Sequence, residues 1–95
     1  MSESMLHELE QIVAARKEKM PADSYTTSLF ERGTNKIAQK VGEEGVEVVI
    51  AALGEGREAQ INEIADLHYH LLVLMAELGI SLADIEAKLR ERHQK

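Results

Sequence analysis

The chain has 95 residues, which is the small end of the range for one domain and leaves no room for a second independent core. Hydrophobic residues make up 44% of the sequence, yet Trp is absent, Phe occurs once and Tyr twice, so a core must be built from aliphatic side chains. The formal net charge of -6 argues against a non-specific nucleic-acid surface, which needs clustered Lys and Arg. Because Cys is absent, disulfides, thiolate metal sites and thiol nucleophiles are excluded.

The N-terminal segment gives no sign of targeting. Met1 to Glu10 lack the basic-then-apolar pattern of a signal peptide, and no apolar run approaches the roughly 18 residues of a membrane span. We therefore expect a cytoplasmic protein without a membrane partner. A core of this size supplies only roughly 3–5 kcal/mol, and small domains often gain further stability by association. A homodimer is the default expectation.

Two helices are predicted before residue 33. From Ser4 to about Lys19, apolar residues recur at helical spacing, with Ser2 or Ser4 as the candidate cap. Pro21 ends this helix, because proline has no backbone donor and restricts Met20 to extended geometry. Ser24 to Arg32 then forms a short helix that Gly33 stops.

Three further helices follow. Thr34 is placed to cap a helix from about Asn35 to Leu53, and Gly54-Glu55-Gly56 is the clearest break in the chain. The next helix, from about Arg57 to Leu78, ends at Gly79 and should run antiparallel to the preceding one because the connection is short. The last helix starts at Ser81, whose spacing to Asp84 matches a capping box. The sequence thus predicts a single all-α domain over residues 1–95, a bundle of about four to five helices.

The helix from Asn35 to Leu53 carries one charged stripe between two apolar flanks. At about 100° per residue, the stripe holds Lys36, Lys40, Glu44 and Glu47, with Glu43 at its edge. The flanks contain Ile37, Val41, Val48 and Ala52 on one side and Val46 and Ile50 on another. A helix of this kind is expected to be largely buried. Charges enclosed by apolar faces indicate a pocket or groove.

The next helix repeats the pattern. Glu63, Asp66 and His70 lie on one side, opposite the apolar residues Ile64, Leu67, Leu71, Leu74 and Leu78. If the two helices are antiparallel, Glu44, Glu47, Glu63 and Asp66 can surround one small volume, which is costly without a cation. Oxygen ligands favour Mg²⁺, with Mn²⁺ as a substitute, and Mg²⁺ usually completes its coordination with water and substrate phosphates. The implied substrate is phosphorylated, and Lys36 and Lys40 could neutralise its phosphates.

Two motifs resemble a known metal site. The segment Glu43-Glu44-x-x-Glu47 followed one helix later by Glu63-x-x-Asp66 is similar to the site of the all-α, MazG-like NTP pyrophosphohydrolase superfamily. Further matches, including Ser24-Tyr25-Thr26, Lys40-Val41-Gly42-Glu43-Glu44 and Tyr69-His70, resemble one branch, the phosphoribosyl-ATP pyrophosphohydrolase family. The resemblance extends from about residue 21 to residue 93.

The resemblance implies a helical homodimer that hydrolyses phosphoribosyl-ATP to phosphoribosyl-AMP and pyrophosphate, the second step of histidine biosynthesis. Glu44, Glu47, Glu63 and Asp66 would hold the metal, which activates a water for attack on the α,β-phosphoanhydride. Either Glu43 or Glu44 would be the general base, and the choice between them stays open. Lys36 and Lys40 would stabilise charge on the phosphates.

The resemblance also implies substrate contacts from Ser24, Tyr25, Thr26 and His70. Ser and Thr before a helix are more often caps, and Lys40 could instead form only ion pairs with its own helix. Many family members are fused to a phosphoribosyl-AMP cyclohydrolase. We expect this chain to be too short to include that enzyme, with which it could associate as a separate protein.

Two other functions stay open at this point. A relative that acts on ordinary or damaged nucleoside triphosphates would use the same metal site with a different pocket for base and sugar. A non-catalytic helical dimer could use the acidic stripe to bind a metal or a partner protein. Turnover of competing substrates with Mg²⁺ present distinguishes the three.

Overall fold

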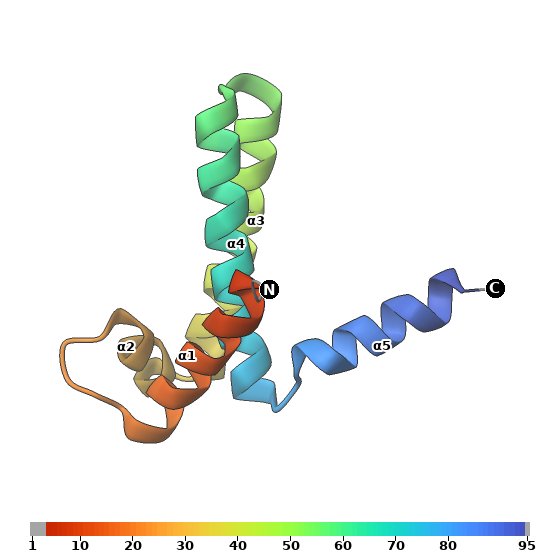
Figure 1. Ribbon diagram of the computed structural model, residues 1–95. Coiled ribbons are helices and arrows are strands. Elements are labelled where there is room, and N and C mark those ends of the chain that lie inside the picture. Colours follow the sequence, from red (N-terminus) through yellow and green to blue (C-terminus); the bar gives the residue numbers. More distant parts are fainter. Residues whose placement is uncertain (1–3, 95) are drawn as a thin grey trace.

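The computed structural model describes residues 4–94, which form five α-helices and no strand (Figure 1). The helices are α1 (Met5–Lys19), α2 (Tyr25–Arg32), α3 (Thr34–Gly54), α4 (Arg57–Leu78) and α5 (Leu82–His93). The all-α prediction is confirmed, and every boundary lies close to the predicted residue. Among the described residues, no helix combines the length and the apolar composition that crossing a bilayer requires.

Local capping explains most of the helix ends. The Ser24 hydroxyl accepts a hydrogen bond from the Thr27 backbone N–H at the start of α2. Ser81 and Asp84 form the predicted capping box of α5. Gly79 ends α4 in the left-handed conformation, with φ of 73°. Ser4 occupies the cap position of α1 without a side-chain hydrogen bond, and Ser2 lies outside the described residues.

Two predictions about connections are wrong. Met20 is left-handed (φ 48°, ψ 54°) rather than extended, because its N–H donates to the Arg16 carbonyl and closes the last turn of α1. Thr34 is not the cap of α3 but its first residue. Gly33, at φ of 89°, both ends α2 and caps α3, and the Thr34 hydroxyl instead donates to Glu77 Oε2 on α4 at 2.7 Å.

The core lies where four helices meet. Its fully buried side chains come one from each of α1 to α4: Val13, Leu29, Ile37 and Val73. Phe30 and Tyr69 are among the partly buried residues that pack against them. Burying an aliphatic side chain of this size contributes about 1.5–3 kcal/mol, so these few residues carry much of the stability of the single chain.

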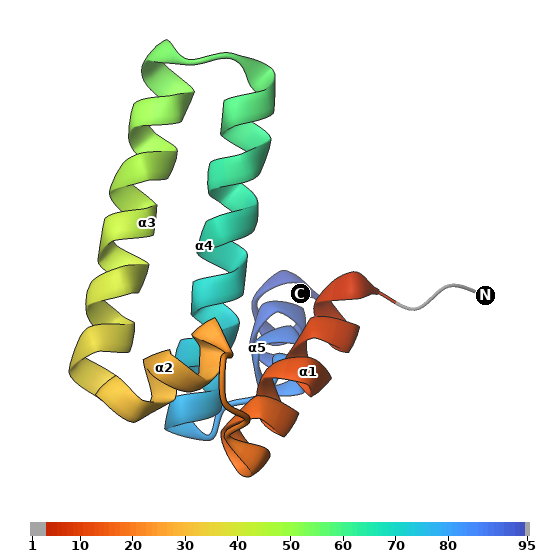
Figure 2. The same cartoon turned by 90° about the vertical axis from the view of Figure 1, so that its left-hand side faces the viewer.

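Helices α3 and α4 form an antiparallel hairpin that extends beyond the other helices (Figure 2). The Gln60 amide closes its tip by donating to the carbonyls of Ala51 and Glu55. The prediction that α3 is largely buried is wrong for the single chain, because α3 faces only α4 over much of its length. Ile37 and Ala51 are its fully buried residues, whereas Ala52, predicted for the buried seam, is exposed.

Apolar side chains remain exposed on the hairpin. We call the set formed by Val46, Val49, Ile50 and Leu53 of α3 with Ile61 and Ile64 of α4 the hairpin apolar face; its members are 43–84% exposed. So many exposed aliphatic side chains on one hairpin are candidates for an interaction surface. Helix α5 projects away from the hairpin (Figure 1), and its first residue, Leu82, donates its N–H to Glu10 Oε2 of α1.

Candidate metal and substrate site

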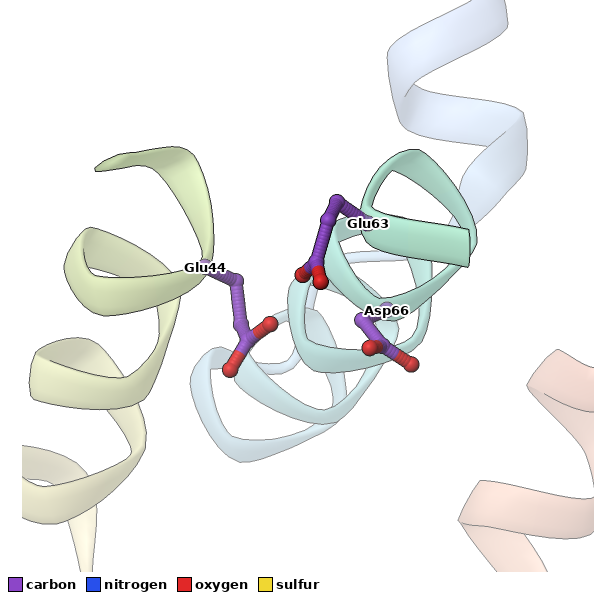
Figure 3. A group of neighbouring side chains, drawn as sticks. All are labelled: Glu44, Glu63 and Asp66. Carbon is purple, nitrogen blue, oxygen red and sulfur yellow. The ribbon is translucent and has the colours of Figure 1, made fainter. Parts of the chain in front are cut away.

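Three carboxylates from the two hairpin helices come together. Glu44 on α3 points across to Glu63 and Asp66 on α4 (Figure 3). Each residue offers one oxygen, and these oxygens lie within 4.8 Å of one another. The i, i+3 spacing of Glu63 and Asp66 places both on the side of α4 that faces α3. We call Glu44, Glu63 and Asp66 the acidic trio.

The trio is electrostatically unfavourable on its own. Partial burial raises the pKa of Glu63, and the neighbouring carboxylates, with Glu47 first and then Asp66 and Glu44, raise this pKa further. Lys40 Nζ lies 3.7 Å from Glu44 Oε2 at the edge of the group. An oxygen-only donor set with this excess of negative charge suits a hard divalent cation.

The other two predicted acidic residues lie at the edge of the trio. Glu47 is exposed and is not part of the 4.8 Å group, although its charge acts on Glu63. The Glu43 side chain is 49% exposed and accepts hydrogen bonds from Gln39 Nε2 at 2.7 Å and from Lys40. These bonds, with that from Gln39 the largest cause, lower the pKa of Glu43. Metal ligation by Glu47 stays a prediction.

Lys40 forms ion pairs with two glutamates of its own helix. Its Nζ lies 3.4 Å from Glu43 Oε1 and 3.7 Å from Glu44 Oε2, so the predicted ion pairs are present. Burial alone would lower the pKa of Lys40, but Tyr25, Glu43 and Glu44 together outweigh it and raise that pKa. Lys40 therefore stays cationic beside the trio. Lys36 is half-buried one turn earlier, and its charge is the least of the influences that lower the pKa of Glu43.

The start of α2 lies against α4. Ser24 is used as the α2 cap, as the alternative interpretation proposed. The Tyr25 hydroxyl lies 3.3 Å from His70 Nε2, and the Thr26 hydroxyl forms a hydrogen bond with the Tyr69 hydroxyl. The hydroxyls of Tyr25 and Thr26 thus both pair with residues of α4. The Tyr25 side chain nevertheless remains 54% exposed.

Sequence analysis missed two residues that position the site. Tyr69 bonds Thr26 and stacks against Tyr25, with ring centroids 6.3 Å apart, and Gln39 holds the Glu43 carboxylate. Tyr69 precedes His70 within a segment used for the resemblance, but helical periodicity places it on the core side. Gln39 is four residues before Glu43, a spacing that brings side chains together on a helix.

The acidic trio lies on an open face. A cavity of about 330 Å³ between α1 and the end of α4 is lined mainly by apolar residues such as Ala14, Leu72 and Ile80, and it contains no member of the trio. Catalytic pockets are usually concave enough to cover most of a ligand. Glu44 and Glu63 are half-buried and Asp66 is exposed, so the trio is open to solvent in the single chain.

Comparison with known proteins identifies the family. The family model described as phosphoribosyl-ATP pyrophosphohydrolase matches residues 6–93. The histidine biosynthesis bifunctional protein HisIE of Vibrio cholerae is 57% identical over 89 residues, which are 94% of this chain and 42% of that protein. That of Yersinia pestis is 51% identical over 92 residues, 97% of this chain and 45% of the relative, so the chain spans less than half the length of these relatives. The phosphoribosyl-ATP pyrophosphatase of Metallosphaera sedula is 54% identical over 88 residues, 93% of this chain and 95% of that protein. The chain belongs to the phosphoribosyl-ATP pyrophosphohydrolase family.

Proposed function

We propose that the chain hydrolyses the α,β-phosphoanhydride of phosphoribosyl-ATP and releases phosphoribosyl-AMP and pyrophosphate. Family membership over residues 6–93 supports this activity. The acidic trio is the observation that carries the chemistry, because three clustered carboxylates fit a phosphate-handling metal site.

Mg²⁺ is the proposed cofactor, with Mn²⁺ as a substitute. The donor set fits, since Glu44, Glu63 and Asp66 offer oxygen ligands only. Burial first, and then the neighbouring carboxylates, raise the pKa of Glu63, and a cation would relieve the repulsion among these carboxylates. Glu47 is close enough to act on Glu63 and is proposed as a further ligand. When bound, the metal would polarise the phosphates and lower the pKa of the attacking water.

The protein's own residues would orient the substrate and move the proton. Lys40 and, one turn earlier, Lys36 would stabilise negative charge on phosphate oxygens and on the departing pyrophosphate. Of the two candidate bases, Glu43 has a lowered pKa and is held by Gln39 and Lys40. A lowered pKa weakens Glu43 as a proton acceptor, and Glu44 remains the alternative base. Tyr25, which is exposed, is the α2 residue best placed to meet the nucleotide.

A homodimer would complete the site. The hairpin apolar face exposes six aliphatic side chains around the helices that carry the trio. Pairing this face with its copy would form a four-helix arrangement, bury the exposed side chains and supply walls that one chain lacks. We also propose association with a cyclohydrolase activity, because relatives in which this domain is under half of the length bear the name bifunctional protein.

The substrate assignment is tested by pyrophosphate release from phosphoribosyl-ATP, ATP and dNTPs, each with and without Mg²⁺. We expect Mg²⁺-dependent release from phosphoribosyl-ATP, with at least about 100-fold loss in Glu63→Gln. Glu58→Gln, an exposed glutamate in the first turn of the same helix, is the control and should keep full activity. Preference for another triphosphate would retain the metal site but reject the substrate. Failure to release pyrophosphate from any nucleotide would favour the non-catalytic dimer.

A further inference from the structure

Two adjacent residues of α4 bond two adjacent residues of α2. His70 contacts the Tyr25 hydroxyl, and the Tyr69 hydroxyl pairs with Thr26. We call these four residues the α2–α4 clasp. The two helices are more than 40 residues apart in the chain at each bond, so the clasp fixes where the start of α2 sits relative to the trio.

His70 is fully engaged within the protein. It is buried, with 6% of its surface exposed, and its Nδ1 lies 2.8 Å from the backbone carbonyl of Asp66, a member of the trio. A carbonyl can only accept, so Nδ1 carries a proton, and the tautomer with a single ring proton has its lone pair on Nε2. That nitrogen lies 3.3 Å from the Tyr25 oxygen, so in this tautomer it accepts a hydrogen bond from the Tyr25 hydroxyl. Neither ring nitrogen is left for a substrate or a metal.

The direction of this bond limits what Tyr25 can do. With its only proton directed at His70, the phenol oxygen can accept a hydrogen bond but cannot donate one. Phosphate oxygens need donors, whereas sugar hydroxyls and ammonium groups can donate. Tyr25 is thus suited to a hydroxyl of the nucleotide or to Lys40, and not to the phosphates themselves.

The rings hold Tyr25 in this orientation. Tyr69 lies edge-on to His70, with centroids 4.9 Å apart, and is stacked against Tyr25 at an interplanar angle of 28°. Edge-on and offset arrangements are the favourable geometries for aromatic pairs, so these contacts restrain the rings. Tyr25 is therefore held both by its hydrogen bond to His70 and by the Tyr69 ring.

We propose that His70 is a positioning residue that acts through Tyr25: the chain of hydrogen bonds from the Asp66 carbonyl through the His70 ring fixes the Tyr25 oxygen as an acceptor for a sugar hydroxyl of the bound nucleotide. This inference rests on the proposed function for the identity of the nucleotide. In this proposal His70 does not contact the substrate directly, in contrast to the expectation from the sequence, but holds Tyr25, which does.

Steady-state kinetics test the proposal with Tyr25→Phe, His70→Ala, His70→Gln and the double variant Tyr25→Phe/His70→Ala. Loss of one oriented hydrogen bond in the Michaelis complex should raise KM about tenfold in Tyr25→Phe with kcat nearly unchanged. His70→Ala should raise KM similarly, the double variant should be no worse than its worse parent, and Gln, which offers an acceptor in place of Nε2, should recover part of the loss. Additive effects, or a fall in kcat at constant KM, would overturn the proposal.

A second measurement is independent of turnover. Nitrogen NMR of the His70 ring should show a protonated Nδ1 and an unprotonated Nε2, and Tyr25→Phe should shift the Nε2 signal alone. The opposite tautomer in the wild type would refute the hydrogen-bond direction, whatever the substrate is. Absence of activity in the wild type together with the expected NMR result would reject the proposed function while retaining the orientation of Tyr25.

Discussion

The two ends of the α3–α4 hairpin differ in burial and in charge. At the inner end, Ile37 and Val73 are fully buried against Val13 of α1 and Leu29 of α2. Further out, the same helices place three carboxylates within 4.8 Å and leave apolar side chains such as Val49 and Ile64 exposed. The inner end gains stability from packing, whereas the outer end accepts unfavourable charge and exposure. The outer end therefore contributes little to the stability of one chain, and it carries the groups that the proposed cation, nucleotide and second copy would contact.

The largest expected effect is at the inner end. Ile37→Ala should lower the free energy of unfolding by about 2–5 kcal/mol, because it removes three carbons from a fully packed site. Urea unfolding followed by circular dichroism measures this change. As the matched control, Ile85→Ala on α5, where the side chain is 40% exposed, should cost much less. Equal losses in the two variants would remove the distinction between inner core and periphery.

The hairpin apolar face provides the next test. Val49→Glu keeps a helix-compatible residue but places a charge on a position that is 56% exposed in the single chain. If the face pairs with its copy, the dissociation constant of the dimer should rise at least about 100-fold. Sedimentation velocity across a range of protein concentrations measures it, with Ala87→Glu on the exposed surface of α5 as control. An unchanged dimer would locate the interface elsewhere.

A smaller effect is expected at the start of α2. Ser24→Ala removes the hydroxyl that accepts the Thr27 N–H and should cost about 1 kcal/mol. Since this cap precedes Tyr25, KM for the nucleotide should also rise, whereas the response to Mg²⁺ should not change. The control is Ser28→Ala. Ser28 lies later in the same helix, and its hydroxyl donates to the Tyr25 carbonyl. Equal effects of both changes on KM would argue against a specific role of the cap.

The smallest effect concerns the pH dependence of the metal-free protein. The pKa of Glu63 is higher in the folded chain than in the unfolded chain. At a pH between these two pKa values, the folded state therefore binds more protons than the unfolded state. Stability without metal should therefore increase as the pH falls into this window and decrease as the pH rises through the folded pKa. Glu63→Gln should unfold at a slightly higher temperature than the wild type above that pKa and should lose this pH dependence. Thermal unfolding in chelator at several pH values detects the difference, and a lower unfolding temperature in the variant would contradict it.

Helix ends and the acidic trio could be predicted because each depends on local signals. Gly79 and the Ser81–Asp84 pair mark the end of α4 and the start of α5 directly in the sequence. The trio needs only two helical stripes and a connection short enough to make the helices antiparallel. Glu44, Glu63 and Asp66 meet for that reason, whereas Glu47, one turn further along α3, falls outside the 4.8 Å group.

The packing face of α4 could not be predicted from periodicity. Leu71 and Leu78 belong to the predicted apolar side but are 37% and 54% exposed, while Leu72 and Val73 are buried. Helix α4 is apolar on more than one side, and the position of α1 decides which side forms the core. The α2–α4 clasp could not be predicted from the sequence either, because the contact of Tyr25 with His70 depends on how α2 packs against α4.

Metal binding by the acidic trio is the central claim, and a Mn²⁺ titration followed by electron paramagnetic resonance tests it most directly. The wild type and Glu58→Gln should bind Mn²⁺ with the same affinity, and added Mg²⁺ should displace it. Asp66→Asn and Glu63→Gln should weaken binding at least about tenfold, since each removes a charged oxygen ligand. Equal affinity in all four proteins would contradict a metal site at Glu44, Glu63 and Asp66.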